Sequence, residues 1–168
     1  MDSLSCSISI RPFRSEDSEA CFRIRAEAYI REFYEYLGPE GVAAGVNAFM
    51  PGDYVTMAQT MPTFVADLDG RVAGFCVIRF VDAATADLLL IYVNLAHLSQ
   101  GIGTGLAQHA EAWLLEHQPQ VYELVVDTVI PRYNQAFYER LGFQPIAEHP
   151  FEFPGKTVRA VRLSKRLR

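Results

Sequence analysis

The chain has 168 residues, half of them hydrophobic, which suits one domain spanning residues 1–168 with a sizeable core. Its net charge is −5, and because nucleic-acid binders usually carry an excess of positive charge, DNA and RNA are disfavoured as partners. The sequence has neither a long apolar run that would span a membrane nor the basic start of a signal peptide, and its three widely spaced cysteines fit reduced thiols in the cytoplasm.

The first half of the chain predicts one strand, two helices and a two-stranded hairpin. Ser15 to Ser18 supply an N-cap and an acidic first turn for a helix, Gly38-Pro39 breaks that helix, and Pro51-Gly52-Asp53 ends the next one. Asp69-Gly70 is a strong hairpin signal between two strands. The expected elements are strand 5–14, helices 19–37 and 40–49, and strands 63–68 and 72–81.

The second half predicts a strand, a crossover helix and a second strand, followed by a short helix and two final strands. The apolar run 86–95 is typical of a strand buried on both faces, and in the next helix Ile102, Leu106 and Ala110 share one face. The expected elements are strand 86–95, helix 101–118, strand 121–130, helix 133–141, and strands 143–153 and 157–167. The order β-α-α-β-β-β-α-β-α-β-β indicates an α/β fold with a mixed sheet flanked by helices, in which residues 86–130 form a parallel unit.

A glycine-rich segment follows the buried strand and opens an amphipathic helix. It consists of Gln100, Gly101, Ile102, Gly103, Thr104 and Gly105. Backbone N–H groups at a helix start are unpaired, and together with the helix dipole they form a site for an anion. Glycine lets a phosphate approach the backbone closely, so a pyrophosphate is the natural ligand. A glycine-rich loop that holds no ligand is the alternative.

Two better-known glycine motifs are excluded. A P-loop needs Lys and then Ser or Thr after its last glycine, where this chain has Leu106 and Ala107. A dinucleotide-binding fingerprint needs the spacing G-x-G-x-x-G after the first strand, with an acidic residue about twenty positions later. Here the spacing is G-x-G-x-G and the segment lies late in the chain.

The spacing resembles the acetyl-CoA signature of the GNAT superfamily, (Q/R)-x-x-G-x-(G/A). Gly101 and Gly103 occupy its two small positions. Leu98 stands where the family has Gln or Arg, and Leu95 stands where a proline is common. Leu98 leaves the backbone amides in place but removes one polar side chain from the cofactor site.

A second segment resembles the F-Y-x-x-x-G-F motif that GNAT proteins often carry on the helix after the fifth strand. It is Phe137-Tyr138 followed by Gly142-Phe143. Pro131 and Asn134 stand where the family usually has Asn and Ala, so the chain is similar to the variant with Asn just before the F-Y pair. The two motifs occur in the family's order with a strand between them, over residues 86–143, and together they make the resemblance specific.

The resemblance implies a cofactor site between splayed strands. In the GNAT fold the fourth and fifth strands diverge, and the pantetheine arm of acetyl-CoA lies between them. Backbone groups of Val93 to Leu95 would pair with that arm, an N–H there would hold the thioester oxygen, and Gln100 to Gly105 would hold the pyrophosphate. Asn134 would either hydrogen-bond the cofactor or cap the last helix.

The resemblance also implies catalytic residues. Tyr138 would give a proton to the departing thiolate, as the second residue of F-Y often does in this family; a core aromatic is the alternative. Asp87 stands where some members have a glutamate base; a merely solvated Asp, or a water relay instead of a base, is the alternative. Glu27, Glu32 and Glu35 lie among aromatic residues on the first helix, where they would suit a cationic amine or simply form its polar face.

These residues predict an N-acetyltransferase that moves the acetyl group of acetyl-CoA to a primary amine of a small molecule or peptide, by direct attack in a ternary complex. The alternative is a module of the same fold that binds acyl-CoA without turnover, which Leu98 and the open question of the base motivate. No Cys/His pair or carboxylate cluster has metal-ligand spacing, so no metal is expected. The sequence does not identify the acceptor amine. A homodimer could form, because proteins of this fold often dimerise.

Overall fold

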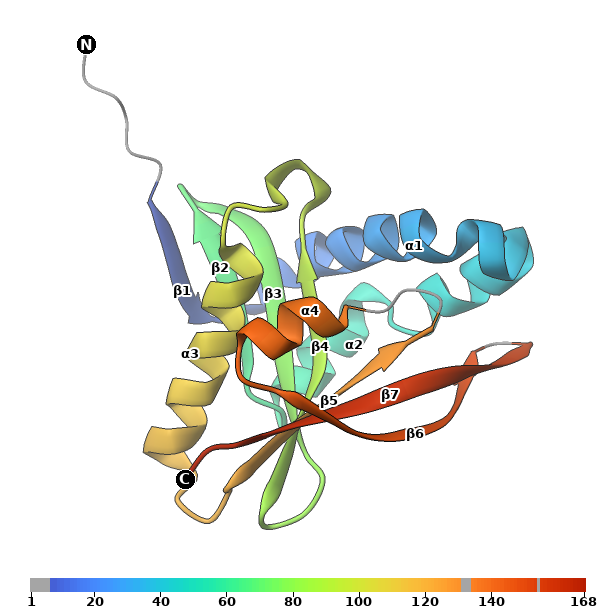
Figure 1. Cartoon of the computed structure of the whole chain (residues 1–168). Helices are drawn as coiled ribbons and strands as arrows, with labels where there is room; N and C mark the ends of the chain where they lie inside the picture. The colour runs from blue at the N-terminus through green and yellow to red at the C-terminus, as the bar shows by residue number, and fades with distance from the viewer. Residues whose placement is uncertain (1–6, 131–133, 154) are drawn as a thin grey trace.

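The computed structural model describes residues 7–130, 134–153 and 155–168. A seven-stranded sheet in the order β1-β2-β3-β4-β5-β7-β6 forms the centre of the molecule, with helices packed against it (Figure 1). The strands are β1 Ile8–Pro12, β2 Thr63–Leu68, β3 Arg71–Phe80, β4 Thr85–Val93, β5 Glu123–Val129, β6 Gln144–Phe153 and β7 Lys156–Arg166. The helices are α1 Ser18–Asn47, α2 Pro51–Ala58, α3 Ile102–His117 and α4 Gln135–Arg140, with short 3-10 helices η1 Ser15–Asp17 and η2 Leu95–His97.

The order of strands and helices confirms the predicted β-α-α-β-β-β-α-β-α-β-β fold. β4 and β5 are parallel, as the crossover through α3 requires, and the other neighbouring strands are antiparallel. The sheet is therefore mixed, with one parallel pair at its centre.

No helix in the described ranges is long and apolar enough to span a membrane.

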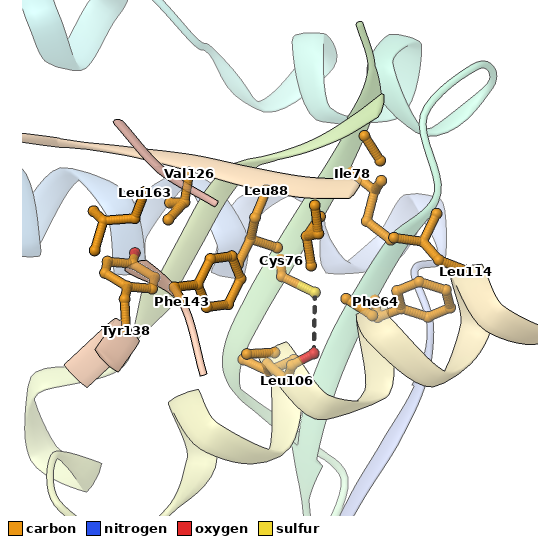
Figure 2. Packing of buried hydrophobic residues seen from close by; sticks show 14 of the residues in the cluster. Phe64, Cys76, Ile78, Leu88, Leu106, Leu114, Val126, Tyr138, Phe143 and Leu163 are labelled. Atoms are coloured by element: carbon orange, nitrogen blue, oxygen red, sulfur yellow. Dashed lines mark hydrogen bonds between the residues drawn. The ribbon is translucent and has the colours of Figure 1, made fainter. Parts of the chain in front are cut away.

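The hydrophobic core lies on both faces of the sheet. The largest cluster packs α3 and α4 against one face, and Figure 2 shows Leu106 and Tyr138 of these helices beside Cys76 and Leu163 of the strands. The thiol of Cys76 donates to the carbonyl of Leu106 at 3.8 Å, and burial raises its pKa to about 12. Cys76 is thus the core residue that its apolar surroundings predict. Two smaller clusters pack α1 and α2 against the other face.

The region of α1 and α2 differs from the prediction in part. The expected break at Gly38 is confirmed, because Gly38 departs from helical geometry (φ 70°, ψ 176°) and α1 consists of two helical segments that meet there. The second segment folds back on the first, since Arg25 reaches the carbonyl of Gly45 at 3.0 Å. Pro51 begins α2 instead of ending a helix, because proline fits the first helical position. Asp53 supports this start by accepting the backbone N–H of Met50 at 2.7 Å. α2 therefore occupies a segment where turn-forming residues predict a loop.

Of two predicted strand boundaries, one is confirmed and one is wrong. Asp69 (φ 51°) and Gly70 (φ 84°) form the expected tight turn between β2 and β3. The strand expected to reach Leu95 ends at Val93, and Leu95 begins η2. The side chain of Asn94 accepts the N–H of Ala96 at 2.9 Å and so caps that short helix, which turns the chain out of the sheet.

Candidate active site

The strands β4 and β5 are hydrogen-bonded neighbours over only a short stretch. The pairing runs from Thr85 opposite Glu123 to Asp87 opposite Val125. β4 continues to Val93 and β5 to Val129, so beyond Asp87 the two strands part (Figure 1). One edge of β4 over residues 88–93 therefore carries backbone N–H and C=O groups that β5 does not satisfy, although antiparallel β3 pairs with the other edge.

The N-terminus of α3 carries the glycine-rich segment. Its first intrahelical hydrogen bond runs from the N–H of Gly105 to the carbonyl of Gly101 at 2.9 Å, so within the described ranges the N–H groups of residues 102–104 have no acceptor. Gly101 has φ 80°, a left-handed conformation that glycine adopts most readily. A Cβ on Gly103 would lie 3.4 Å from the Phe137 ring and 3.6 Å from Val93, so this loop sits against both β4 and α4.

The remaining predicted cofactor residues lie around this loop. Gln100 and Leu98 are exposed beside it, and Val93 is the last residue of β4. Leu95 lies in η2, so its backbone lacks the extended conformation that strand-like pairing with a pantetheine arm would need. The role of these residues in holding a cofactor stays a prediction.

Asn134 precedes α4, but its side chain makes no capping hydrogen bond. Asn134 thus occupies the N-cap position of α4 without the side-chain hydrogen bond of a cap. Its backbone N–H donates to the hydroxyl of Thr128 at 3.1 Å, which ties the start of α4 to β5. The exposed amide side chain remains available for a ligand.

Asp87 is the last β4 residue paired with β5, and it is only 4% exposed. Its cross-strand neighbour on β3 is Arg79, whose guanidinium forms an ion pair and hydrogen bond with Oδ2. No other hydrogen bond reaches this carboxylate from the described residues, so Oδ1 has no donor. Burial raises the pKa of Asp87, and the Arg79 charge partly opposes the rise. The sequence-predicted base is thus a buried carboxylate with one free oxygen.

Tyr138 projects from α4 into the core beside Phe143 (Figure 2) and is 6% exposed. Its ring lies against those of Phe137 and Phe143 at centroid distances of 5.0 and 5.8 Å. No described residue is a hydrogen-bond partner of its hydroxyl. Burial is the main cause that raises its pKa, and Tyr92, Glu32 and Asp87 add to the rise electrostatically. The phenol therefore stays protonated to a higher pH than an ordinary tyrosine does, and it interacts electrostatically with the Asp87 carboxylate.

Tyr92 is a site residue that the sequence patterns did not single out. It lies on the part of β4 that β5 does not pair with, stacks on Phe75 at 5.9 Å, and interacts electrostatically with Tyr138 and Glu32. Its sequence signal is a phenol in the apolar run that follows Asp87 in β4. Asp87, Tyr92 and Glu32 of α1 thus all interact electrostatically with Tyr138, whereas Glu27 and Glu35 are exposed.

The described residues contain no group of three His, Cys, Asp or Glu side chains that could hold a metal ion. What the site offers instead is a free strand edge, unpaired helix N–H groups, a buried carboxylate and a buried phenol. Such a set can bind an anion and a peptide-like arm, and it can move protons.

Comparison with known proteins gives a consistent result. A model of the acetyltransferase (GNAT) family matches residues 15–143. A protein of Chlorobaculum tepidum that is named as an N-acetyltransferase is 35% identical over 88 residues, which make up 52% of this chain and 53% of that protein. The chain thus spans about half the length of the curated relative it matches.

Solved structures of similar fold include two with a bound coenzyme. PaiA N-acetyltransferase from Thermoplasma acidophilum in complex with coenzyme A has a TM-score of 0.77 at 17% identity, over 95% of this chain and 99% of that one. YncA from Salmonella typhimurium with acetyl-CoA has a TM-score of 0.74 at 18% identity, over 96% and 95%. These structures share the mixed sheet and its flanking helices with the chain.

Proposed function

The chain belongs to the acetyltransferase (GNAT) family, and from this premise we propose that it transfers the acetyl group of acetyl-CoA to a primary amine of a small molecule or peptide. The observation that carries the proposal is the place of Asp87 and Tyr138. A buried carboxylate with a free oxygen and a buried phenol interact electrostatically where β4 and β5 part. Acetyl transfer to an amine requires a proton acceptor and a proton donor at one point.

The residues at this point also fit acetyl-CoA as co-substrate. The N–H groups of residues 102–104, at the positive end of the α3 dipole, suit the pyrophosphate. The free β4 edge that ends at Val93 suits the amides of the pantetheine arm. Gln100 lies in the same region of the fold, as does Asn134, whose side chain makes no capping hydrogen bond. Acetyl-CoA supplies the acetyl group as a thioester, whose carbonyl carbon the amine attacks.

Asp87 would act as the general base. Its Oδ1 can accept the proton that the amine loses when the new N–C bond forms, because Arg79 occupies only Oδ2. Burial raises the pKa of Asp87 and so makes it a stronger base than an exposed aspartate. Positioned bases of this kind contribute roughly a hundredfold to ten-thousandfold in rate.

Tyr138 would act as the general acid. As the C–S bond breaks, its phenol can donate a proton to the leaving thiolate. Asp87 then releases to solvent the proton that it took from the amine, and the phenolate regains a proton from solvent. The complete reaction forms one amide and releases coenzyme A as a free thiol. Both substrates would be bound together, because the amine attacks the thioester directly.

The test is an assay of free thiol with acetyl-CoA and a panel of amino acids, polyamines, antibiotics and peptide N-termini. Asp87→Asn should lower kcat/KM at least about a hundredfold with coenzyme A affinity unchanged by calorimetry. Glu116→Gln, at an exposed carboxylate on α3, is the control and should keep full activity. Binding of coenzyme A without thiol release with any amine would favour a non-catalytic acyl-CoA-binding module, and absence of binding would rule out both functions.

A further inference from the structure

Two ion pairs form a row across one face of the sheet, with an arginine at each end and the two carboxylates between them. Arg79 of β3 pairs with Asp87 of β4, and Asp127 of β5 pairs with Arg162 of β7. Asp87 lies opposite Val125, which shares its face of β5 with Asp127, so both carboxylates point to the same side of the sheet. Cross-strand partners share a face, so the row runs from β3 to β7, with Asp127 two residues beyond the partner of Asp87 on β5.

The two carboxylates of this row differ in how fully they are occupied. Asp127 accepts two hydrogen bonds from Arg162, both at 2.9 Å, and a third from His149 at 3.0 Å, so both of its oxygens are used. Among the residues that the structure describes, Arg79 is the one that donates a hydrogen bond to Asp87. A carboxylate has room for about four such bonds, so Asp87 has more free acceptor sites than Asp127, and its Oδ1 is the one oxygen of the two carboxylates without a donor among the described residues.

The protonation state of Asp87 depends on a few neighbouring charged groups. Arg79 and Arg162 favour its ionised form, Asp127 disfavours it, and Tyr138 on the α4 side interacts with it. Arg162 is already bound to Asp127, so Arg79 is the one cation hydrogen-bonded to Asp87 within the described ranges. A carboxylate buried beside a like charge without such a partner is protonated and cannot act as a base.

We propose that Arg79 is a positioning residue for acetyl transfer, which holds the ionised Asp87 carboxylate by Oδ2 and thereby presents Oδ1 to the acceptor amine. This inference rests on the proposed function, in which Asp87 is the base. The side chain of Arg79 is 45% exposed and that of Asp87 is 5% exposed, so the guanidinium reaches the carboxylate from the solvent side. In this role Arg79 acts through its bond to Asp87.

The pH profile of kcat/KM tests the proposal. In Arg79→Gln the acid limb should move upward by about one to three pH units, the usual effect of an adjacent arginine on an aspartate. Arg79→Lys keeps the charge and should restore most of the profile. Arg71→Gln, at an exposed arginine of the same strand, is the matched control and should leave the profile unchanged. A role in stability alone would lower the melting temperature without moving the acid limb.

A second measurement separates this proposal from the function on which it rests. The 13C signal of the Asp87 carboxyl, assigned by its loss in Asp87→Asn, can be titrated in the protein without substrates. A higher midpoint in Arg79→Gln than in wild type is the expected result. An unmoved midpoint with Asp87→Asn inactive would overturn the Arg79 proposal alone. Full activity in Asp87→Asn would overturn the base role and this inference with it.

Discussion

The guanidinium of Arg25 donates a hydrogen bond to the carbonyl of Gly45 at 3.0 Å, which joins the segment of α1 before Gly38 to the C-terminal end of the segment after it. The last four carbonyls of a helix have no intrahelical donor, and α1 ends at Asn47. Arg25 is 5% exposed and lies over the rings of Tyr29 and Phe49, its guanidinium carbon 5.2 and 4.8 Å from their centroids. Helix carbonyls and aromatic faces thus stabilise this buried cation.

Replacing Arg25 should therefore weaken the fold. Arg25→Met leaves the Gly45 carbonyl without its donor, so the free energy of unfolding should fall by about 1–3 kcal/mol, the usual range for an unsatisfied buried group. Urea unfolding measures the change. Arg23→Met, at an exposed arginine of the same helix, should shift stability by less than about 0.5 kcal/mol. Equal urea midpoints for the two variants would contradict this explanation of Arg25.

Gly45 should not tolerate even alanine. A Cβ at this position would lie 2.2 Å from the hydroxyl oxygen of Tyr29, whose ring is held against Phe33 at a centroid distance of 4.9 Å. Overpacking costs about 1–3 kcal/mol and exceeds the gain of up to about 1 kcal/mol in helix propensity. Gly45→Ala should thus lower the melting temperature. Gly52→Ala, where a Cβ meets nothing within 4 Å, should leave it unchanged or raise it.

His149 should make stability depend on pH near neutrality. Its Nδ1 lies 2.9 Å from the Pro150 carbonyl and its Nε2 3.0 Å from Asp127, and because both partners only accept, the ring donates both bonds only as imidazolium. The bond to Asp127 is the main cause that raises the pKa of His149. The stabilisation is therefore complete below the unfolded value, about 6.5, and is lost as pH rises through the folded pKa.

The measurement is the free energy of unfolding of wild type and His149→Gln at a series of pH values that brackets about 6.5. The advantage of the wild type should shrink as pH rises. In an Asp127→Asn background most of this pH dependence should disappear, because the carboxylate that favours the imidazolium is gone. An advantage that stays constant across the series would show that the ring is not charged in the folded protein.

The cofactor loop can be tested with Gly103→Glu. The carboxylate would lie among the free N–H groups at the start of α3 and compete with a pyrophosphate, so coenzyme A affinity should fall at least about tenfold while the helix persists. Gln108→Glu makes the same charge change on the exposed face of α3 and should leave affinity intact. Gly103→Ala, whose Cβ would meet the Phe137 ring at 3.4 Å, shows how much of any loss is steric. Calorimetry measures all three.

The outline of the fold could be predicted because its signals are local. The Asp69-Gly70 turn and the buried face of α3 depend on residues close in sequence, and both are present in the structure. α2 could not be predicted, because Pro51 favours a turn and a helix start equally and packing of Tyr54 against Phe75 at 5.6 Å decides between them.

The site could be predicted only in part, for the same physical reason. Asp87 and Tyr138 lie in or near recognisable motifs. Arg79 became visible only through the register of β3 against β4, which contains an irregularity between Val77 and Ile78. A shift of one residue would place Arg79 on the opposite face of the sheet, away from Asp87, and no sequence pattern fixes a register of that kind.

Tyr138→Phe tests the proposed acid directly. The change keeps the ring against Phe137 and Phe143 and removes only the hydroxyl, so kcat should fall at least about tenfold if the phenol protonates the thiolate. Coenzyme A affinity should barely change, because the packing remains. Tyr122→Phe, at a tyrosine that is 50% exposed, should have full activity.

The pH profile adds a second criterion for Tyr138. Because burial raises the pKa of the phenol above its ordinary value, wild-type kcat should show no basic limb from this group up to about pH 10. If Tyr138 is only a core residue, Tyr138→Phe should keep its turnover and change stability by at most about 1 kcal/mol through a lost hydrogen bond to solvent. Full turnover in this variant would mean that another group or solvent protonates the thiolate. Loss of turnover with unchanged coenzyme A affinity and melting temperature would place the proton on Tyr138, because neither binding nor folding could then account for the loss.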